Sequence, residues 1–294
     1  MACNQVAGVG SYFWDFISEV IRGSETAYPT IFMDSSHDSI TVAIAALNEE
    51  THLKGAVETV LRAVSRHFES FEIIIFNDGS TDGTGRIADT LAECHQQVTV
   101  VHHERPKCLG GVIRSGLSRA RMKRFMWVDG KGATTEAALD AIFSLRDKAD
   151  LVVPYPCNQH ERALRRRIIS RAFVTLVGML FRTDLKYYTH VALFHTAQAR
   201  QFSVRTDSYA YQAEALIKMI RAGHTYVQVG VEDCYSQEDG QTKAFKLNNV
   251  TGIATFLLGT LWDVYVVRGF RRSANGAKNS VTAPQPVSLE ERSG

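Results

Sequence analysis

The chain has 294 residues, of which 45% are hydrophobic and 22% charged, and its formal net charge is +2. This is an ordinary globular composition, long enough for one large domain or two small ones, and the near-neutral charge argues against nucleic acid as a partner. The five cysteines are scattered without CxxC or Cys/His spacing, which excludes a disulfide framework or zinc site and predicts reduced thiols in a cytoplasmic protein.

The chain begins with residues 1–38, a predicted N-terminal extension in which 12–21 has helical apolar spacing, and no secretory signal peptide is expected there. Short apolar runs then alternate with amphipathic segments. The expected strands are 39–47, 72–76, 98–102, 125–128 and 150–153, and the expected helices are 48–68, 82–92, 110–122 and 134–144. Strands separated by helices of this length predict an α/β fold with a mostly parallel sheet, covered by helices on both faces.

The second half of the chain is less regular. Helices are expected at 168–180 and 209–222, with Gly223 as the stop, and strands at 191–195 and 225–231. The predicted organisation is a catalytic-type domain over 39–249, an apolar or amphipathic helix over 250–272 and a disordered polar tail over 273–294.

Three polar loops directly follow expected strands: AALNEE (45–50), NDGSTDGT (77–84) and VDGKG (128–132). Ligands in open α/β sheets lie at the carboxyl ends of the strands, so we expect the three loops along one edge. In the second loop, Asp78 can accept a hydrogen bond from the N–H of a nucleotide base. Ser80 or Asp82 can cap the next helix. The alternative is a well-capped turn that binds no ligand.

The segments VAIAALNEE, IIIFNDGSTDGT and LGGVIRSG resemble family 2 glycosyltransferases of the GT-A fold, in particular the dolichyl- or polyprenyl-phosphate sugar transferases. The resemblance covers roughly residues 39–250, including LRRRIISR and YQAEALIKMIRAGHTYVQVGV. It implies a nucleotide-diphospho-sugar transferase fold. It also implies transfer of a sugar, with inversion, from a nucleoside-diphosphate donor to an acceptor such as a polyprenyl phosphate.

The resemblance implies a donor-binding set at the strand ends and at the start of the 110–122 helix. This set is Ala45, Leu47, Glu49, Asp78, Lys107, Gly110, Gly111 and Arg114. Glu49 and Asp78 would bind ribose or base, whereas Ala45 and Leu47 replace the family's proline and aromatic residue. A glycine-rich helix start beside a cation suits a diphosphate. The alternative is a surface turn and a helix with an exposed arginine.

The family's Asp-x-Asp motif, which holds Mg²⁺ or Mn²⁺, is incomplete in WVDGKGATTE, where Asp129 is present but Lys131 replaces the second carboxylate. Three interpretations remain. A metal binds through Asp129 and more distant groups; Lys131 itself offsets the leaving-group charge; or the chain is a non-catalytic nucleotide-sugar-binding protein. We expect weak or absent metal dependence, with Asp129 and Lys131 as catalytic candidates.

The acceptor side is marked by basic residues. The resemblance implies that Arg165, Arg166 and Arg171 receive a lipid phosphate; a solvated basic face, or attraction to anionic headgroups, is the alternative. Lys243 stands in QTK, which is similar to the family's Ser-Lys segment. His190 and His195 stand where arginine or lysine is expected, so either could donate to a phosphate or act as a base for a soluble hydroxyl or specialised metabolite; a structural role is the alternative.

A hydroxyl acceptor requires a carboxylate base, for which Asp207 and Glu214 are the candidates; a helix-surface role is the alternative for Glu214. The apolar stretch 250–267 contains Trp262 and Asp263, so we expect an interfacial helix with peripheral membrane contact, or an ordinary packing helix, rather than a spanning one.

Overall fold

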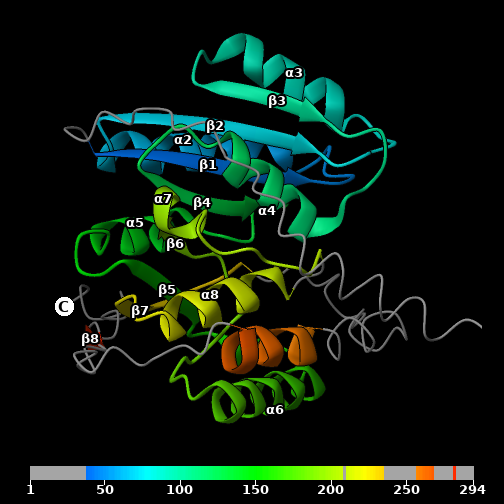
Figure 1. Ribbon diagram of the computed structural model, residues 1–294. Coiled ribbons are helices and arrows are strands. Elements are labelled where there is room, and N and C mark those ends of the chain that lie inside the picture. The colour runs from blue at the N-terminus through cyan, green and yellow to red at the C-terminus, as the bar shows by residue number, and fades with distance from the viewer. Residues whose placement is uncertain (1–37, 208–209, 235–255, 268–280, 283–294) are drawn as a thin grey trace, which may run out of the picture. The chain divides into compact units, whose positions relative to one another are not determined.

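The computed structural model of the protein describes residues 38–207, 210–234, 256–267 and 281–282. Within these residues one sheet has the strand order β3-β2-β1-β4-β6-β5-β7-β8 (Figure 1). The strands are β1 (Ser39–Ala46), β2 (Ser70–Asn77), β3 (Val98–His102), β4 (Arg124–Asp129), β5 (Leu151–Pro156), β6 (Leu193–His195), β7 (Tyr226–Val231) and β8 (Val281–Thr282). All neighbours pair in parallel except β6, which is antiparallel to β4 and β5. The prediction of a mostly parallel sheet is confirmed.

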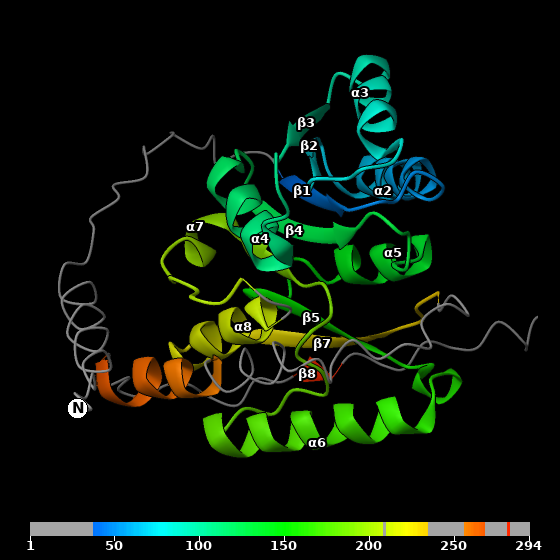
Figure 2. The ribbon, with the colours of Figure 1, turned by 90° about the vertical axis from the view of Figure 1, so that its right-hand side faces the viewer.

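Helices cover both faces of this sheet (Figure 2). They are α2 (Leu53–His67), α3 (Thr84–Cys94), α4 (Cys108–Arg119), α5 (Glu136–Ser144), α6 (Leu164–Phe181), α7 (Thr196–Ala199) and α8 (Tyr211–Arg221). Helices α2, α3 and α5 lie on one face, and α4, α7 and α8 on the other. A short 3-10 turn, η1 (Gln159–Glu161), precedes α6. A C-terminal helix over 256–267 ends in a π-helical turn at Asp263–Val267.

The amphipathic periodicity of the sequence explains the helix positions. In α2 the buried residues recur every three or four positions, which places one apolar stripe against the sheet. These residues are Leu53, Ala56, Val57, Val60, Ala63 and Val64. α5 begins at a conventional cap, because the Thr135 hydroxyl accepts the N–H of Ala138 at 3.1 Å. The expected helix at 48–68 begins only at Leu53, because residues 48–50 form a polar loop.

The strand order creates a switch point between β1 and β4. From β1 the chain goes outward to β2 and β3, then returns to pair β4 on the other side of β1. The register places Ala45 opposite Phe76 on one side and Asp129 on the other. Such a reversal in an open parallel sheet positions a binding site at the carboxyl ends of the two diverging strands.

The C-terminal helix packs between α6 and α8. Its Tyr265 hydroxyl donates to the carbonyl oxygen of Leu180 at 2.7 Å, and Phe256 lies 6.4 Å from Phe173, between ring centroids. None of the helices in the described residues is long and apolar enough to cross a bilayer. The predicted helix at 12–21, and the tail over 273–294 apart from β8, lie outside the described residues.

Candidate functional site

The three polar loops lie together at the carboxyl edge of neighbouring strands β2, β1 and β4, as the parallel-sheet rule predicted. The N–H of Gly130, directly after β4, donates to the carbonyl oxygen of Ala45 at 2.8 Å. The N–H of Asp78, directly after β2, donates to the carbonyl oxygen of Ala46 at 2.8 Å. Backbone hydrogen bonds therefore fix the relative positions of the Asp78 and Asp129 loops across the end of β1.

Most polar side chains of the first two loops bind one another. Asn48 Oδ1 accepts the N–H of Thr81 at 2.9 Å, and the Asn48 N–H donates to the Ser80 hydroxyl at 3.0 Å. Glu50 Oε2 accepts the N–H of Gly83 at 2.7 Å. The hydroxyls and glycines of NDGSTDGT thus largely join two loops, and of the two predicted caps in this described part of the chain only Asp82 contacts the start of α3, where its Oδ1 accepts the N–H of Thr84 at 3.0 Å. The same contacts hold in place the loops that carry Glu49 and Asp78.

Asp78 is a buried carboxylate with protein partners on one oxygen. Its Oδ1 accepts the N–H of Lys107 at 2.8 Å and lies 2.7 Å from His103 Nδ1, with both side chains less than a tenth exposed. Gly79 has φ +75°, and a Cβ there would lie 2.8 Å from Pro106 Cδ. The Asp78 loop is therefore held by the 103–107 segment, which places Lys107 beside it.

His103 was missed in the sequence analysis. It stands directly after β3, so the strand-end rule that selected Asp78 also applies to it. Its Nε2 is buried without a hydrogen-bond partner among the described residues. With Nδ1–H donated to Asp78, the ring would hold the carboxylate in one orientation.

The charge of Glu49 interacts with charged residues of the third loop. Partial burial raises the pKa of Glu49 above its ordinary value of 4.5, and the negative charge of Asp129 acts in the same direction. His52, whose Nδ1 lies 3.3 Å from Glu49 Oε2, and the ammonium of Lys131 oppose that rise. Glu49, Asp129 and Lys131 are therefore close enough for their charges to interact.

The Asp129 turn fits a divalent cation poorly. One Asp129 oxygen already accepts the N–H of Ala133 at 3.0 Å, closing a turn in which Gly132 has φ +75°. Lys131, an ammonium, is exposed on that turn. No group of three or more His, Cys, Asp or Glu side chains with metal-site geometry occurs in the described part of the chain. Mg²⁺ and Mn²⁺ at nucleotide sites are held by one or two carboxylates together with phosphate oxygens and water, and this turn offers one carboxylate beside an ammonium that repels a cation.

The start of α4 corrects the expected role of its glycines. A Cβ on Gly110 would lie 2.6 Å from the Cα of Asp207, and a Cβ on Gly111 would lie 2.8 Å from the Cβ of Lys107. The Gly110 N–H donates to the carbonyl oxygen of Asp207 at 2.9 Å. The space at both glycines is thus filled by the chain itself rather than left open for a phosphate. Arg114 also contacts Asp207, with Nη1 2.7 Å from Oδ1.

His190 belongs to the same edge of the sheet. Its Nε2 lies 2.8 Å from Asp233 Oδ1, and both side chains are 8% exposed. Asp233 follows β7 and pairs with Thr134, while the N–H of Cys234 donates to the carbonyl oxygen of Ala133 at 3.0 Å. The His190–Asp233 pair is therefore attached to the Asp129 turn. Asp233 was not identified from the sequence, although it is the second residue after an expected strand.

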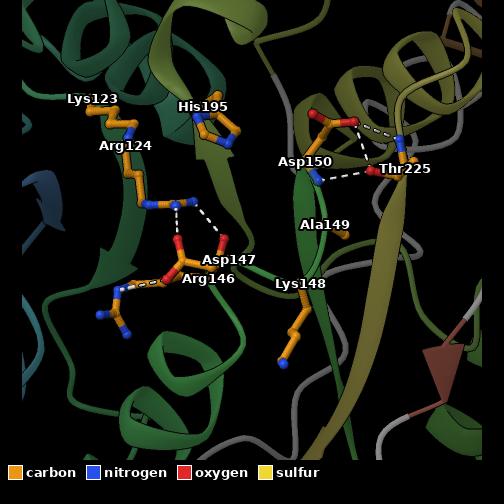
Figure 3. A pocket seen from close by; sticks show the side chains of 9 residues that line it. All are labelled: Lys123, Arg124, Arg146, Asp147, Lys148, Ala149, Asp150, His195 and Thr225. Atoms are coloured by element: carbon orange, nitrogen blue, oxygen red, sulfur yellow. Dashed lines mark hydrogen bonds and ion pairs between the residues drawn. The ribbon is translucent and has the colours of Figure 1, made fainter. Parts of the chain in front are cut away.

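His195 lies at the opposite edge and is not brought to the Asp129 turn. It pairs with Arg124 at the amino end of β4, and Figure 3 shows it in a polar pocket with Lys123, Arg124 and Asp150. Burial, followed by the charge of Arg124, holds the pKa of His195 below its ordinary value of 6.5. The length of β4 separates this imidazole from Asp129, which removes the geometric basis for an acceptor role.

Glu214 is buried rather than positioned as a base. Its side chain is 2% exposed, Oε1 lies 2.6 Å from Lys218 Nζ, and Oε2 accepts the N–H of Thr206 at 3.3 Å. A general base must reach the proton that it removes. The packing therefore favours a structural role, although inside the protein rather than on the helix surface.

The basic residues of α6 accompany exposed apolar side chains. Arg165 and Arg166 lie in its first turn, directly after η1 at the carboxyl end of β5, and Arg171 lies one to two turns further along. All large hydrophobic residues that are exposed in the described residues, except Leu47, lie on α6 or the C-terminal helix. They are Leu164, Ile168, Leu176, Met179, Leu258, Trp262, Tyr265 and Val266. Lys243 lies outside the described residues.

The sequence was compared with known protein families and curated proteins. The pattern described as Glycosyl transferase family 2 matches residues 41–199. Glycosyltransferase AglD of Haloferax volcanii is 24% identical over 239 residues, which are 77% of this chain and 38% of AglD. The dolichyl-phosphate beta-glucosyltransferase of Mus musculus is 26% identical over 184 residues, 58% of this chain and 53% of that protein. The chain thus spans well under two thirds of either relative.

Solved structures share the fold. Glucosyl-3-phosphoglycerate synthase from Mycobacterium tuberculosis, in complex with Mg²⁺ and UDP, has a TM-score of 0.55 at 15% identity, covering 77% of this chain and 79% of that one. Its complex with Mn²⁺, UDP and phosphoglyceric acid has a TM-score of 0.54 at 17% identity, covering 77% and 78%. The predicted GT-A fold is confirmed, and because the family pattern spans more than half of its residues, the chain belongs to glycosyl transferase family 2.

Proposed function

We propose that the chain transfers a sugar from a nucleoside-diphosphate donor bound at the carboxyl edge of β2, β1 and β4. The observation that carries this proposal is the convergence of Glu49, Asp78 and the Asp129–Lys131 turn on three adjacent strand ends at the switch point. A capped turn alone explains the hydroxyls of the second loop, but it does not require a buried carboxylate at Asp78 with protein partners on one oxygen.

The residues at this edge have separate roles in the proposal. Asp78 Oδ2 accepts an N–H of the base, while Glu49 accepts ribose hydroxyls. The exposed side chains of Leu47 and Lys107 border the same edge, so Leu47 packs on the nucleoside and Lys107 approaches the diphosphate. The bond from sugar C1 to the diphosphate breaks as the acceptor oxygen bonds to C1 from the opposite face, which inverts that carbon.

We also propose that Lys131 offsets the negative charge that develops on the leaving diphosphate. Support comes from the poor fit of the Asp129 turn to a divalent ion and from the exposed position of the ammonium on that turn. Turnover should persist in EDTA, and added Mn²⁺ should change it little. A strict requirement for Mn²⁺ would instead assign the leaving-group charge to a metal held by Asp129.

The acceptor is proposed to be a polyprenyl phosphate reached at a membrane surface. The exposed residues of the C-terminal helix (Leu258, Trp262, Tyr265, Val266) follow the i, i+4, i+7, i+8 spacing of one helical stripe. Leu164, Ile168 and Met179 form a similar stripe on α6, which also carries Arg165, Arg166 and Arg171. Apolar side chains beside arginines suit lipid tails and anionic headgroups.

The rival acceptor class is a soluble hydroxyl or metabolite, for which His190 is the remaining candidate residue. The His190–Asp233 pair is attached to the Asp129 turn and could orient or deprotonate a hydroxyl. Product extraction separates the two classes. A lipid acceptor places the transferred sugar in the organic phase, whereas a soluble acceptor leaves it in the aqueous phase.

A thermal-shift panel tests donor binding directly. UDP-, GDP-, CDP- and TDP-sugars are compared with the free sugars, in the wild type and in Asp78→Asn. At tenfold over Kd a bound nucleotide should add about 1.4 kcal/mol of stability. We expect one base to stabilise the wild type and to lose its effect in Asp78→Asn. Equal shifts in both proteins would place the nucleotide elsewhere.

A further inference from the structure

A cluster of four charges, of which Arg205 is 35% exposed and the other three are largely buried, joins α8, the C-terminal helix and the 203–207 loop. Lys218 Nζ lies 2.6 Å from Glu214 Oε1 and 2.7 Å from Asp263 Oδ2. Arg205 Nη2 lies 2.6 Å from Asp263 Oδ1. The side chains of Lys218, Glu214 and Asp263 are 4%, 2% and 11% exposed. Two cations balance two carboxylates, which is the condition under which charges are tolerated in a protein interior.

This charge cluster (Arg205, Glu214, Lys218, Asp263) holds the loop by its backbone. The Glu214 carboxylate accepts the N–H groups of Arg205 at 3.1 Å and Thr206 at 3.3 Å. Lys218 Nζ donates to the carbonyl oxygen of Ser203 at 2.6 Å. Residues 203–207 belong to neither a helix nor a strand, so these bonds to buried charges take the place of regular backbone pairing.

The same loop contacts the start of α4. Arg114 Nη2 donates to the carbonyl oxygen of Val204 at 3.0 Å, and Arg114 Nη1 lies 2.7 Å from Asp207 Oδ1. The N–H of Gly110 donates to the carbonyl oxygen of Asp207 at 2.9 Å. Arg114 is 45% exposed, so its orientation is set by the loop while part of the guanidinium faces solvent.

We propose that Asp263 and Lys218 are positioning residues for the donor site, acting through the 203–207 loop on Arg114. The proposal rests on the proposed function, in which Lys107, directly before α4, approaches the donor diphosphate, and it adds Arg114 of the same helix to the groups that face the donor. Asp263 is the contribution of the C-terminal helix to the charge cluster, next to the exposed Trp262. The helix that carries this exposed residue therefore also determines how the donor site is held.

The test uses the full chain and the nucleotide sugar that gives the largest stabilisation in the thermal-shift panel. Asp263→Asn removes one negative charge and leaves Lys218 and Arg205 with a single carboxylate between them. We expect the donor KM to rise about tenfold, in the range of typical coupling energies, with kcat at saturating donor changed by less than about twofold. Asp263→Glu should restore most of the donor affinity.

The matched control is Glu72→Gln. Glu72 is 4% exposed and lies 2.6 Å from Arg121 Nη2, but it stands near the amino end of β2, at the other edge of the sheet. Its loss should lower stability as Asp263→Asn does, without raising the donor KM. An equal rise of KM in Asp263→Asn and Glu72→Gln would overturn the proposal, because general loosening would then explain both.

A double-mutant cycle tests the route through Arg114. In an Arg114→Met background, Asp263→Asn should change the donor Kd by less than about twofold, because the group that it positions is gone. A full, additive effect in that background would refute the proposed route. Failure of the underlying function gives a different result, in which the wild type binds no nucleoside diphosphate at all.

Discussion

The part proposed to bind the donor, residues 38–133 (the donor half), and the described part of residues 156–267, proposed to bind the acceptor (the acceptor half), order their polar groups in different ways. In the donor half, polar residues stand directly after strands and join neighbouring loops, as Asn48 does with Thr81. In the acceptor half, polar contacts join helices and loops, as Lys218 does with Asp263. Sequence separation does not distinguish them, since the two pairs are 33 and 45 residues apart. The difference is that sheet topology dictates only the first kind of contact.

The two halves also differ in the charge of their contacts. The donor loops are joined mainly by hydrogen bonds from backbone N–H groups, each worth about 1 kcal/mol net. The acceptor half depends on buried ion pairs, whose disruption leaves an uncompensated charge and costs about 3–5 kcal/mol. Single substitutions should therefore affect stability more in the charge cluster of Glu214, Lys218 and Asp263 than among the backbone-bonded loops where the nucleotide is proposed to bind.

The largest expected effect is that of Lys218→Met, which leaves Glu214 and Asp263 buried without their shared cation. We expect a loss of about 3–5 kcal/mol in the free energy of unfolding, measured by urea denaturation. Lys54→Met is the control, because Lys54 is 72% exposed and lies 3.9 Å from Glu58. It should cost less than about 0.5 kcal/mol. Equal effects of the two substitutions would contradict the contrast between the halves.

Asp78→Ala should have the next largest effect and is the corresponding break in the donor half. The N–H of Lys107 and Nδ1 of His103 lose their acceptor, which should cost about 2–4 kcal/mol. Asp78→Asn retains an oxygen acceptor and should cost about half as much. Urea denaturation of the two variants distinguishes the loss of the acceptor from the loss of the charge. An Asp78→Ala variant as stable as the wild type would show that the carboxylate does not accept hydrogen bonds from Lys107 and His103.

Trp262→Ser tests the exposed stripe of the C-terminal helix. Burying a large apolar side chain in lipid is worth about 1.5–3 kcal/mol, so binding to vesicles with anionic headgroups should weaken by roughly tenfold or more. Stability should change little, because the side chain is 47% exposed. Leu47→Ser, at a similarly exposed residue in the donor half, should leave vesicle sedimentation unchanged. Equal vesicle binding by the wild type and Trp262→Ser would remove this stripe as a lipid contact.

The smallest expected effect is the pH dependence contributed by Glu49. Burial raises its pKa above 4.5, so the folded state favours the protonated carboxyl. The stabilising contribution is complete below pH 4.5 and is lost as the pH rises through the raised pKa. Glu49→Gln should therefore gain stability relative to the wild type between pH 4 and pH 7, measured by thermal unfolding. A loss of stability in Glu49→Gln relative to the wild type over this pH range would contradict the prediction.

The sequence was sufficient for the fold and for placing Glu49, Asp78 and Asp129 at one edge of the sheet, because strand ends are visible in it. Apolar runs such as IIIF mark buried parallel strands, and a polar residue directly after each one must lie at the carboxyl edge. His103 satisfies the same rule and could have been found by it, whereas Asp233 is one residue further from the end of its strand. The role of Gly110 could not have been found in this way, because Asp207, which fills the space beside it, lies in a loop of no regular structure.

The acceptor side was harder to predict because helix packing has no comparable rule. Glu214 and His195 were both assigned to the site from their residue type and place in the chain. The structure buries Glu214 beside Lys218 and places His195 at the amino end of β4. Helical spacing predicted a helix at 209–222, but it could not identify Asp263, on another helix, as a partner of Lys218.

The most direct test of the central claim is release of nucleoside diphosphate from a labelled nucleotide sugar, with polyprenyl phosphate supplied in mixed micelles. We predict release by the wild type in equal amount to labelled sugar in the organic extract, and loss of both in Asp78→Asn. Donor binding by the wild type, without release of nucleoside diphosphate from any sugar donor, would contradict the claim and leave a nucleotide-sugar-binding protein.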